Sequence, residues 1–123
     1  MVEFAEMPFG GEKTKRFPML TPAMFQILLS LGDREKHGYA IMKDVQHQTS
    51  NEMHLSAGTL YAALARLLKK GLIKESPPRP ESLYDDARRH YYYLTSLGRN
   101  TVAAEAGRMQ KAIAQARLKG FRF

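Results

Sequence analysis

Apolar residues first recur at helical spacing in two stretches near the start of the chain. One stretch follows Thr21, a helix-capping residue, and Pro22, which suits the first helical position. The other runs near Gly38 to Gln48 with its apolar residues on one face, so that Tyr39 and Lys43 point away from that face. These patterns predict two amphipathic helices joined by a short loop.

A third apolar pattern follows the polar stretch QTSNEMHLS. Ser56 is a good N-cap and Gly71 a good helix terminator, so a helix is expected over about Ala57 to Lys70. Its core-facing side should hold the larger apolar side chains together with one alanine: Ala57, Leu60, Leu64, Leu67 and Leu68. Its other side is small and basic: Gly58, Thr59, Ala62, Arg66 and Lys69.

Two β-like runs, LIKE and RHYYYLT, come after this helix and predict a two-stranded hairpin. The segment between them, SPPRPESLYDDAR, contains three prolines and several charges, which fits a long hairpin tip and neither a helix nor a central strand. Tyr92 should share the inward face of Leu94. Packing within the sheet is therefore favoured for the tyrosines over stacking on single-stranded bases.

A last helical stretch follows Thr95 and extends to about Leu118. The order of three helices, a hairpin and one long helix predicts a mainly α (α+β) fold, the winged helix-turn-helix with a two-stranded wing. We expect an N-terminal arm or accessory helix over residues 1–18, a DNA-binding domain over 19–95 and a C-terminal dimerisation helix over 96–123.

Composition narrows the class of partner. The 123 residues include 19 Lys and Arg against 12 Asp and Glu, and the net charge of +7 favours a polyanionic partner such as nucleic acid. Many soluble proteins are basic without such a partner, so the position of the charges has to decide. The absence of cysteine and of any apolar window of about 18 residues predicts a cytoplasmic protein without disulfides.

The small, basic face of the third helix is typical of a DNA reader. Small residues at its N-terminal end allow the backbone to approach the groove floor, and Arg66 and Lys69 can reach base edges or phosphates. Thr59 could donate to a phosphate, and Tyr61 could either do the same or simply pack against the core. The alternative is a solvated basic surface helix.

The hairpin tip offers a second set of basic residues. Arg88 and Arg89 are candidate contacts to phosphates or to the minor groove beside the third helix. Acidic neighbours at Glu81, Asp85 and Asp86 partly cancel this charge. An ordinary solvated loop therefore remains the alternative for the wing.

The last helix carries an apolar seam with alternating spacings of four and three: Val102, Ala106, Met109, Ile113 and Ala116. The seam predicts either an isologous homodimer or packing on its own domain. A dimer would present two recognition helices about 34–36 Å apart, one turn of DNA. Seven methionines allow a small apolar effector between the subunits, although methionine at helical spacing is also ordinary core.

Other function classes find little support. The chain has no phosphate-binding glycine loop, nucleophile elbow or paired carboxylates, so an enzyme is not expected. No cofactor is expected, and the four histidines lie in different elements, which does not favour a metal site. The main rival is a winged-helix module that binds another protein, since a fold does not fix a function.

The segments HGYAI, SAGTLYAALARLLKKGLI and RRHYYYLTSLG, in this order, resemble the PadR family of transcriptional regulators. The resemblance covers roughly Leu20 to Gly98. It implies a homodimeric winged helix-turn-helix protein, usually a repressor, that binds a roughly palindromic operator through residues including Tyr39, Gly58, Thr59 and Tyr61. It also implies that the C-terminal helix forms much of the dimer interface.

Overall fold

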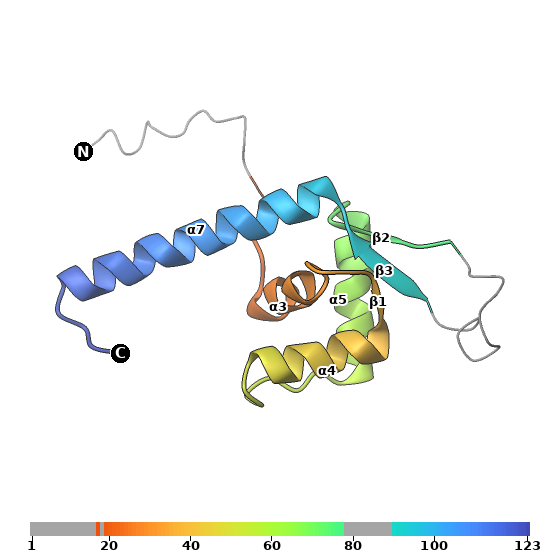
Figure 1. Cartoon of the computed structure of the whole chain (residues 1–123), viewed down its shortest axis with the longest axis horizontal. Helices are drawn as coiled ribbons and strands as arrows, with labels where there is room; N and C mark the ends of the chain where they lie inside the picture. Colours follow the sequence, from red (N-terminus) through yellow and green to blue (C-terminus); the bar gives the residue numbers. More distant parts are fainter. Residues whose placement is uncertain (1–16, 18, 78–89) are drawn as a thin grey trace.

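A computed structural model describes residues 17, 19–77 and 90–123 of the chain. The predicted N-terminal arm lies almost wholly outside the described residues, as do Arg88 and Arg89 of the wing tip. The described part holds four helices and three short strands (Figure 1), in the order α3 Pro22–Ser30, β1 Lys36–His37, α4 Gly38–Gln48, α5 Ala57–Lys69, β2 Ile73–Glu75, β3 Tyr91–Leu94 and α7 Ser96–Leu118.

Side-chain caps fix where three of the helices begin. Thr21 Oγ1 accepts the Met24 amide at 3.1 Å at the start of α3, and Ser56 Oγ accepts the Thr59 amide at 3.1 Å at the start of α5. These bonds satisfy backbone donors that have no partner within the helix. Thr95 caps α7 in the same way. The capping roles predicted for Thr21 and Ser56 are therefore confirmed, and the helix predicted after Thr95 begins at Ser96.

One hydrophobic core joins α3, α4, α5, β2 and β3. Its members are buried apolar side chains at the predicted helical spacings: Met24, Ile27, Leu28, Leu31, Ile41, Val45, Leu60, Ala63, Leu64, Leu67, Leu72, Ile73 and Tyr92. The core differs from prediction at one end of α5. Ala57 is exposed, because the first turn of the helix extends past the core, and Ala63 is buried further along.

The sheet has three strands where two were predicted. The central strand is β3, with β2 on one side and β1 on the other, and both pairings are antiparallel. Lys36 lies opposite Tyr92 and His37 opposite Tyr91. The segment that supplies β1 was interpreted as a loop, since two residues are too few to show alternation in the sequence. Tyr92 is 6% exposed, which confirms its predicted inward face.

The start of α7 lies tightly against the turn between α5 and β2. Thr95 Oγ1 is 2.7 Å from the Gly71 carbonyl oxygen and 3.0 Å from that of Leu72, and it accepts the Gly98 amide at 3.0 Å. A Cβ atom on Gly98 would lie 2.1 Å from the Leu72 carbonyl oxygen. Glycine is therefore the only residue that fits here without movement of the backbone.

Beyond its first turns, α7 leaves the domain. Gly98 and Thr101 are its buried residues, and its C-terminal half extends past α3 and α4 (Figure 1). No helix of the described residues is long and apolar enough to cross a membrane.

Candidate nucleic-acid interface

The outer face of α5 is open along its whole length. Gly58, Thr59, Ala62, Arg66 and Lys69 are all exposed, as their positions on the predicted small, basic face require. A Cβ atom on Gly58 would meet nothing within 4 Å, so nothing inside the described protomer requires glycine at this position. Its small size leaves room for a partner outside the protomer.

The two basic residues of this face form no ion pair with a described carboxylate. Within the part of the chain that the structure describes, no carboxylate forms an ion pair with Arg66 or Lys69. Both side chains stand in the last turns of α5, after the small residues. Their positive charges are therefore available to an anionic partner.

Tyr61 connects α5 to the beginning of α4. Its phenol lies against Gly38, where a Cβ atom would come within 2.4 Å of the Tyr61 hydroxyl oxygen and within 2.9 Å of Cζ. Tyr61 is nevertheless 50% exposed, so its ring packs against Gly38 while part of the side chain faces solvent. Tyr39, next to Gly38, is 61% exposed.

Residues 35–37 join the wing strands to the helices. Glu35 hydrogen-bonds with Ser76 just after β2, and His37 Nδ1 accepts the Ala40 amide at 3.3 Å as the N-cap of α4. The His37 ring also meets the Tyr91 ring of β3 edge-on, with centroids 5.3 Å apart. Three consecutive residues therefore fix the wing relative to the helix-turn-helix.

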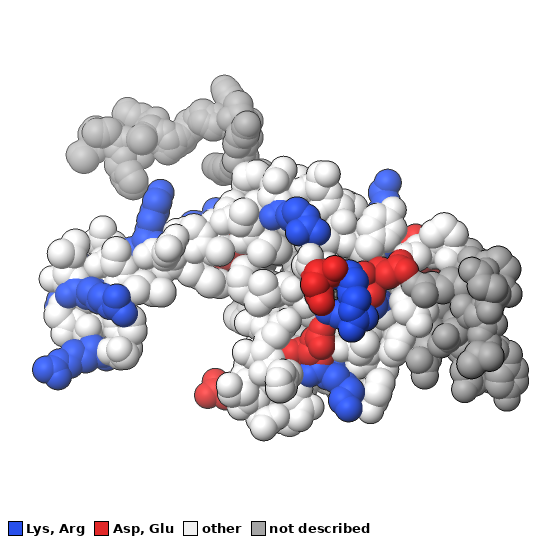
Figure 2. Space-filling view, in the orientation of Figure 1, with Lys and Arg blue, Asp and Glu red and all other residues white. Residues whose placement is uncertain are grey.

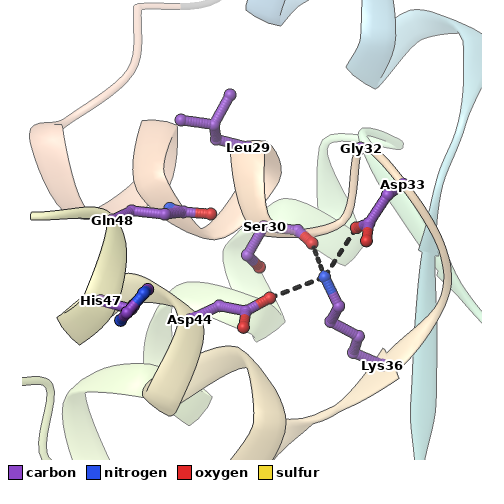
Figure 3. Close-up of a pocket in the computed structure, with 8 residues that line it drawn as sticks. All are labelled: Leu29, Ser30, Gly32, Asp33, Lys36, Asp44, His47 and Gln48. Atoms are coloured by element: carbon purple, nitrogen blue, oxygen red, sulfur yellow. Dashed lines mark hydrogen bonds and ion pairs between the residues drawn. The ribbon is translucent and has the colours of Figure 1, made fainter.

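Lys36 is the centre of this junction (Figure 3). It is 4% exposed, and its ammonium donates to the Ser30 carbonyl oxygen at the end of α3, to Asp33 Oδ1 at 2.7 Å and to Asp44 Oδ2 at 2.6 Å. Nothing in the sequence alone predicted this cluster. Lys36 lies three residues after Asp33 and eight before Asp44, and such spacings are common on protein surfaces. Only the pairing of β1 with β3 buries the lysine.

The charges of this cluster stabilise one another. Burial acts to lower the pKa of Lys36, but hydrogen bonds and attraction from Asp33 and Asp44 outweigh burial and raise that pKa. The hydrogen bond from Lys36 in turn lowers the pKa of Asp33. In the sheet, burial and the negative charge of Glu75 raise the pKa of Tyr92. All three groups thus keep their neutral-pH charge states.

The predicted dimer seam divides into two parts. Val102 is half-buried and packs on the core of its own domain, whereas Met109 and Ile113 are 42% and 44% exposed. Ala106 is exposed and Ala116 is half-buried. The outer part of the seam therefore leaves Met109 and Ile113 partly uncovered among the described residues.

Positive charge also collects far from α5. Figure 2 shows basic side chains at the far end of α7 and the C-terminal tail, a region that includes Arg117, Lys119 and Arg122. In the middle of the same view, acidic and basic side chains are mixed. The net charge alone therefore does not identify the binding face. The small and basic residues on the outer face of α5 indicate it instead.

Metal binding has no support in the described ranges. They contain no group of three or more histidine or acidic side chains that could hold a metal ion. Two surface grooves are present, one beside Lys36 and one between α4 and the turn that precedes α5.

Curated proteins include two relatives of this chain. An uncharacterized protein from Lysinibacillus sphaericus is 34% identical over 77 residues, which are 59% of this chain and 64% of that protein. An uncharacterized 37.1 kDa protein in a transposon of Streptomyces fradiae is 36% identical over 89 residues, which are 72% of this chain and 23% of that protein. The chain thus spans less than two thirds of either relative.

Solved structures with the same arrangement include two clostridial regulators. A PadR family transcription regulator from Clostridium difficile has 28% identity and a TM-score of 0.66, over 78% of this chain and 95% of that one. A transcriptional regulator from Clostridium thermocellum has 26% identity and a TM-score of 0.64, over 80% and 92%. These likenesses confirm the winged-helix fold.

The model of the transcriptional regulator PadR-like family matches residues 27–104, more than half of the chain. The matched range contains the glycine–tyrosine contact between α4 and α5, the open face of α5 and the Thr95–Gly98 junction. The chain therefore belongs to the PadR-like family, whose members are transcriptional regulators and not enzymes.

Proposed function

We propose that this protein is a cytoplasmic repressor that binds a roughly palindromic site in double-stranded DNA as a homodimer. The observation that carries the proposal is the outer face of α5. It combines Gly58, where the described residues leave room for a side chain, with Arg66 and Lys69, which form no ion pair with any described carboxylate. A helix with a merely solvated face would favour long polar residues over these small ones. The α5 face fits a major groove.

The proposed roles follow the position of each residue. Gly58 and Ala62 allow close approach, Thr59 and Tyr61 donate hydroxyls to phosphates, and Lys69 contacts the backbone. Tyr39, which follows Gly38 in α4, is exposed and is proposed as a further phosphate contact. Arg88 and Arg89 retain their proposed role in the wing, outside the described residues.

Arg66 should read a base. Replacing Arg66 by alanine should weaken binding to the preferred sequence by about 1–3 kcal/mol and relax the preference at one base pair, because a guanidinium can donate two hydrogen bonds to guanine. The preferred sequence would first be selected from random duplex DNA, and affinities for single-base variants of it would then be measured.

Lys111→Ala is the matched control for Arg66→Ala. Lys111 is exposed on α7, away from α5, so its loss should leave both affinity and base preference nearly unchanged. If Arg66→Ala weakens all sequences equally, Arg66 contacts the backbone and the base-reading role is wrong. If it changes nothing, the α5 face is not the reading surface.

Salt dependence separates DNA recognition from the rival protein-interaction module. With about 6–10 phosphate contacts, affinity for duplex DNA should fall by about 10³–10⁵ between 50 and 200 mM salt, through release of counterions. Failure to bind duplex DNA even in dilute salt would exclude the proposed function and leave the rival.

The proposed dimer rests on the uncovered seam of α7. Replacing Ile113 by glutamate should convert the dimer to a monomer and strongly weaken operator binding, because it places charge where apolar surface should pack on the partner. Sedimentation measures the oligomeric state. Gln110→Glu, an exposed position outside the seam, is the control, and a dimer that survives Ile113→Glu would contradict the proposed interface.

The apolar effector remains a prediction. The groove beside Lys36 and the groove between α4 and the turn before α5 are both lined partly by charged side chains, and the second includes a methionine, Met42.

A further inference from the structure

A titratable side chain, His37, stands at the point where the sheet meets α4. His37 pairs with Tyr91 across β1 and β3, and side chains alternate along a strand, so Glu35 lies on the same side of the sheet as both of them. Lys36 takes the opposite, core side together with the buried Tyr92. Histidine is the side chain whose charge ordinarily changes between about pH 5 and 8.

The His37 side chain is the N-cap of α4. Its Nδ1 accepts the Ala40 amide at 3.3 Å, which satisfies a backbone donor that has no partner within the helix. Only an unprotonated Nδ1 has a lone pair for this bond, because both ring nitrogens of a protonated histidine carry hydrogen. The helix dipole acts in the same direction, since the N-terminal end of a helix disfavours positive charge. Protonation of His37 therefore removes the cap.

The other described helices begin at caps that do not titrate near neutral pH. Thr21, Ser56 and Thr95 cap α3, α5 and α7 through their hydroxyl oxygens. Serine, threonine, aspartate and asparagine are the residues ordinarily preferred at this position, and histidine is not among them. Among the helices that the structure describes, α4 is thus the one whose cap depends on a change of charge in this range.

The groups around His37 favour different charge states of its ring. The titratable and charged side chains on its side of the sheet are Glu35, Lys74, Tyr91 and Tyr93. The first turn of α4 carries no charged side chain. The Tyr91 ring meets the His37 ring edge-on, with centroids 5.3 Å apart, a contact that is possible in either charge state. The Glu35 carboxylate, which accepts a hydrogen bond from Ser76, attracts a protonated ring, whereas the Ala40 amide requires a neutral one.

The cap is one residue away from a tight contact with the recognition helix. Gly38 follows His37 and is buried against α5, where a Cβ atom on it would collide with the Tyr61 hydroxyl oxygen and lie 3.3 Å from Leu60 Cδ2. The first turn of α4 therefore packs on α5 without spare room. A change that loosens this turn should also change the position of Tyr61 and, through it, the outer face of α5.

We propose that protonation of His37 at mildly acidic pH releases this protein from DNA. The neutral ring caps α4 and holds its first turn against Tyr61, whereas the protonated ring gives up the Ala40 amide and is drawn to Glu35. Protons and duplex DNA then favour opposite states of one helix end, so each weakens the binding of the other. The inference rests on the proposed function and adds a pH switch to it.

The test compares wild type with His37→Asn between about pH 8 and pH 5 at constant salt. Asparagine is a strong N-cap that does not titrate, so only wild type should lose its cap. The affinity of wild type for the selected duplex, divided by that of His37→Asn, should fall as the pH falls. Loss of a cap costs a factor of about five per helix, so the ratio for a dimer should fall by up to about 25-fold. The other three histidines titrate in both proteins, and their effects cancel in the ratio.

His90→Asn is the matched control. His90 lies beside the same sheet, but its side chain is 69% exposed and its ring bonds to Glu75. This variant should keep the pH dependence of wild type. If His90→Asn abolishes that dependence, the switch belongs to the pair of His90 and Glu75, and the assignment to His37 is wrong. A ratio of wild type to His37→Asn that stays constant across the pH range would equally overturn the proposal.

Urea unfolding separates the cap from its coupling to DNA. The urea midpoint of wild type should fall relative to that of His37→Asn as the pH falls, because the cap bond exists only with a neutral ring. A midpoint difference that changes with pH beside a constant affinity ratio would mean that the cap titrates without moving α5, and would overturn the switch while leaving the proposed function intact. Absence of duplex binding by wild type at every pH would instead remove the proposed function and the switch together.

Discussion

Gly98→Ala should destabilise the protein by about 3 kcal/mol or more, a large share of the stability of a small domain. The added methyl group would lie 2.1 Å from the Leu72 carbonyl oxygen and 2.9 Å from Leu94 Cδ1. The first of these atoms belongs to the backbone and cannot turn aside. Either α7 must move away from the turn, or the bonds made by Thr95 must break. Urea unfolding followed by circular dichroism measures the loss.

Gly107→Ala in the same helix is the natural comparison. A Cβ atom there would meet nothing within 4 Å in the protomer, so alanine should stabilise α7 by about 0.5–1 kcal/mol through its better helix propensity. The two substitutions are chemically identical, but they should change the free energy of unfolding in opposite directions. Equal effects would mean that the junction between α7 and the turn is not packed as described.

Lys36→Met should lower the free energy of unfolding by about 3 kcal/mol, which is the second large effect expected. Methionine keeps much of the side-chain volume, but the buried Ser30 carbonyl oxygen loses its donor and Asp44 loses the charge that it faces. Lys43→Met on the outer side of the next helix should change stability by less than about 0.5 kcal/mol. A similar loss from both variants would show that the Lys36 cluster contributes no more than an exposed lysine.

The contribution of the Lys36 cluster to the free energy of unfolding should be limited to a window of pH. Asp33 has a pKa lowered by folding, so its share is present above the unfolded pKa and is lost as pH falls through the folded value. Lys36 has a pKa raised by folding, so its share is present below the unfolded pKa and is lost as pH rises through the folded value. The difference in unfolding free energy between wild type and Lys36→Met should be largest near neutral pH and shrink at both extremes. A difference independent of pH would contradict the ionic origin.

Local signals in the sequence were enough to predict the helices. Thr21 and Ser56 are capping residues placed directly before apolar periodicity, and each forms the predicted kind of bond in the structure. The helix predicted after Thr95 also begins where expected. The inward side of Tyr92 follows equally from the alternation of a strand. Where the signal lay within a few neighbouring residues, prediction succeeded.

Contacts between distant residues could not be predicted in this way. The two-residue strand β1 exists only because β3 offers it a free edge, some 55 positions later in the chain. The burial of Lys36 follows from that pairing. The α5 face was predicted correctly from a helical wheel, but the contact of Tyr61 with Gly38 depends on how α4 and α5 cross. The wheel also placed Ala57 inside, since it takes no account of where the core ends.

The outer half of α7 bears on how long the regulator survives in a cell. An isolated helix as short as this outer half is only marginally stable in water, and Met109 and Ile113 are 42% and 44% exposed among the described residues. In the proposed homodimer, a subunit that loses its partner would expose a fraying segment to proteases, whereas an assembled one would not. Turnover would then rise when the protein is scarce, so that low abundance reinforces itself and the onset of the proposed repression becomes switch-like.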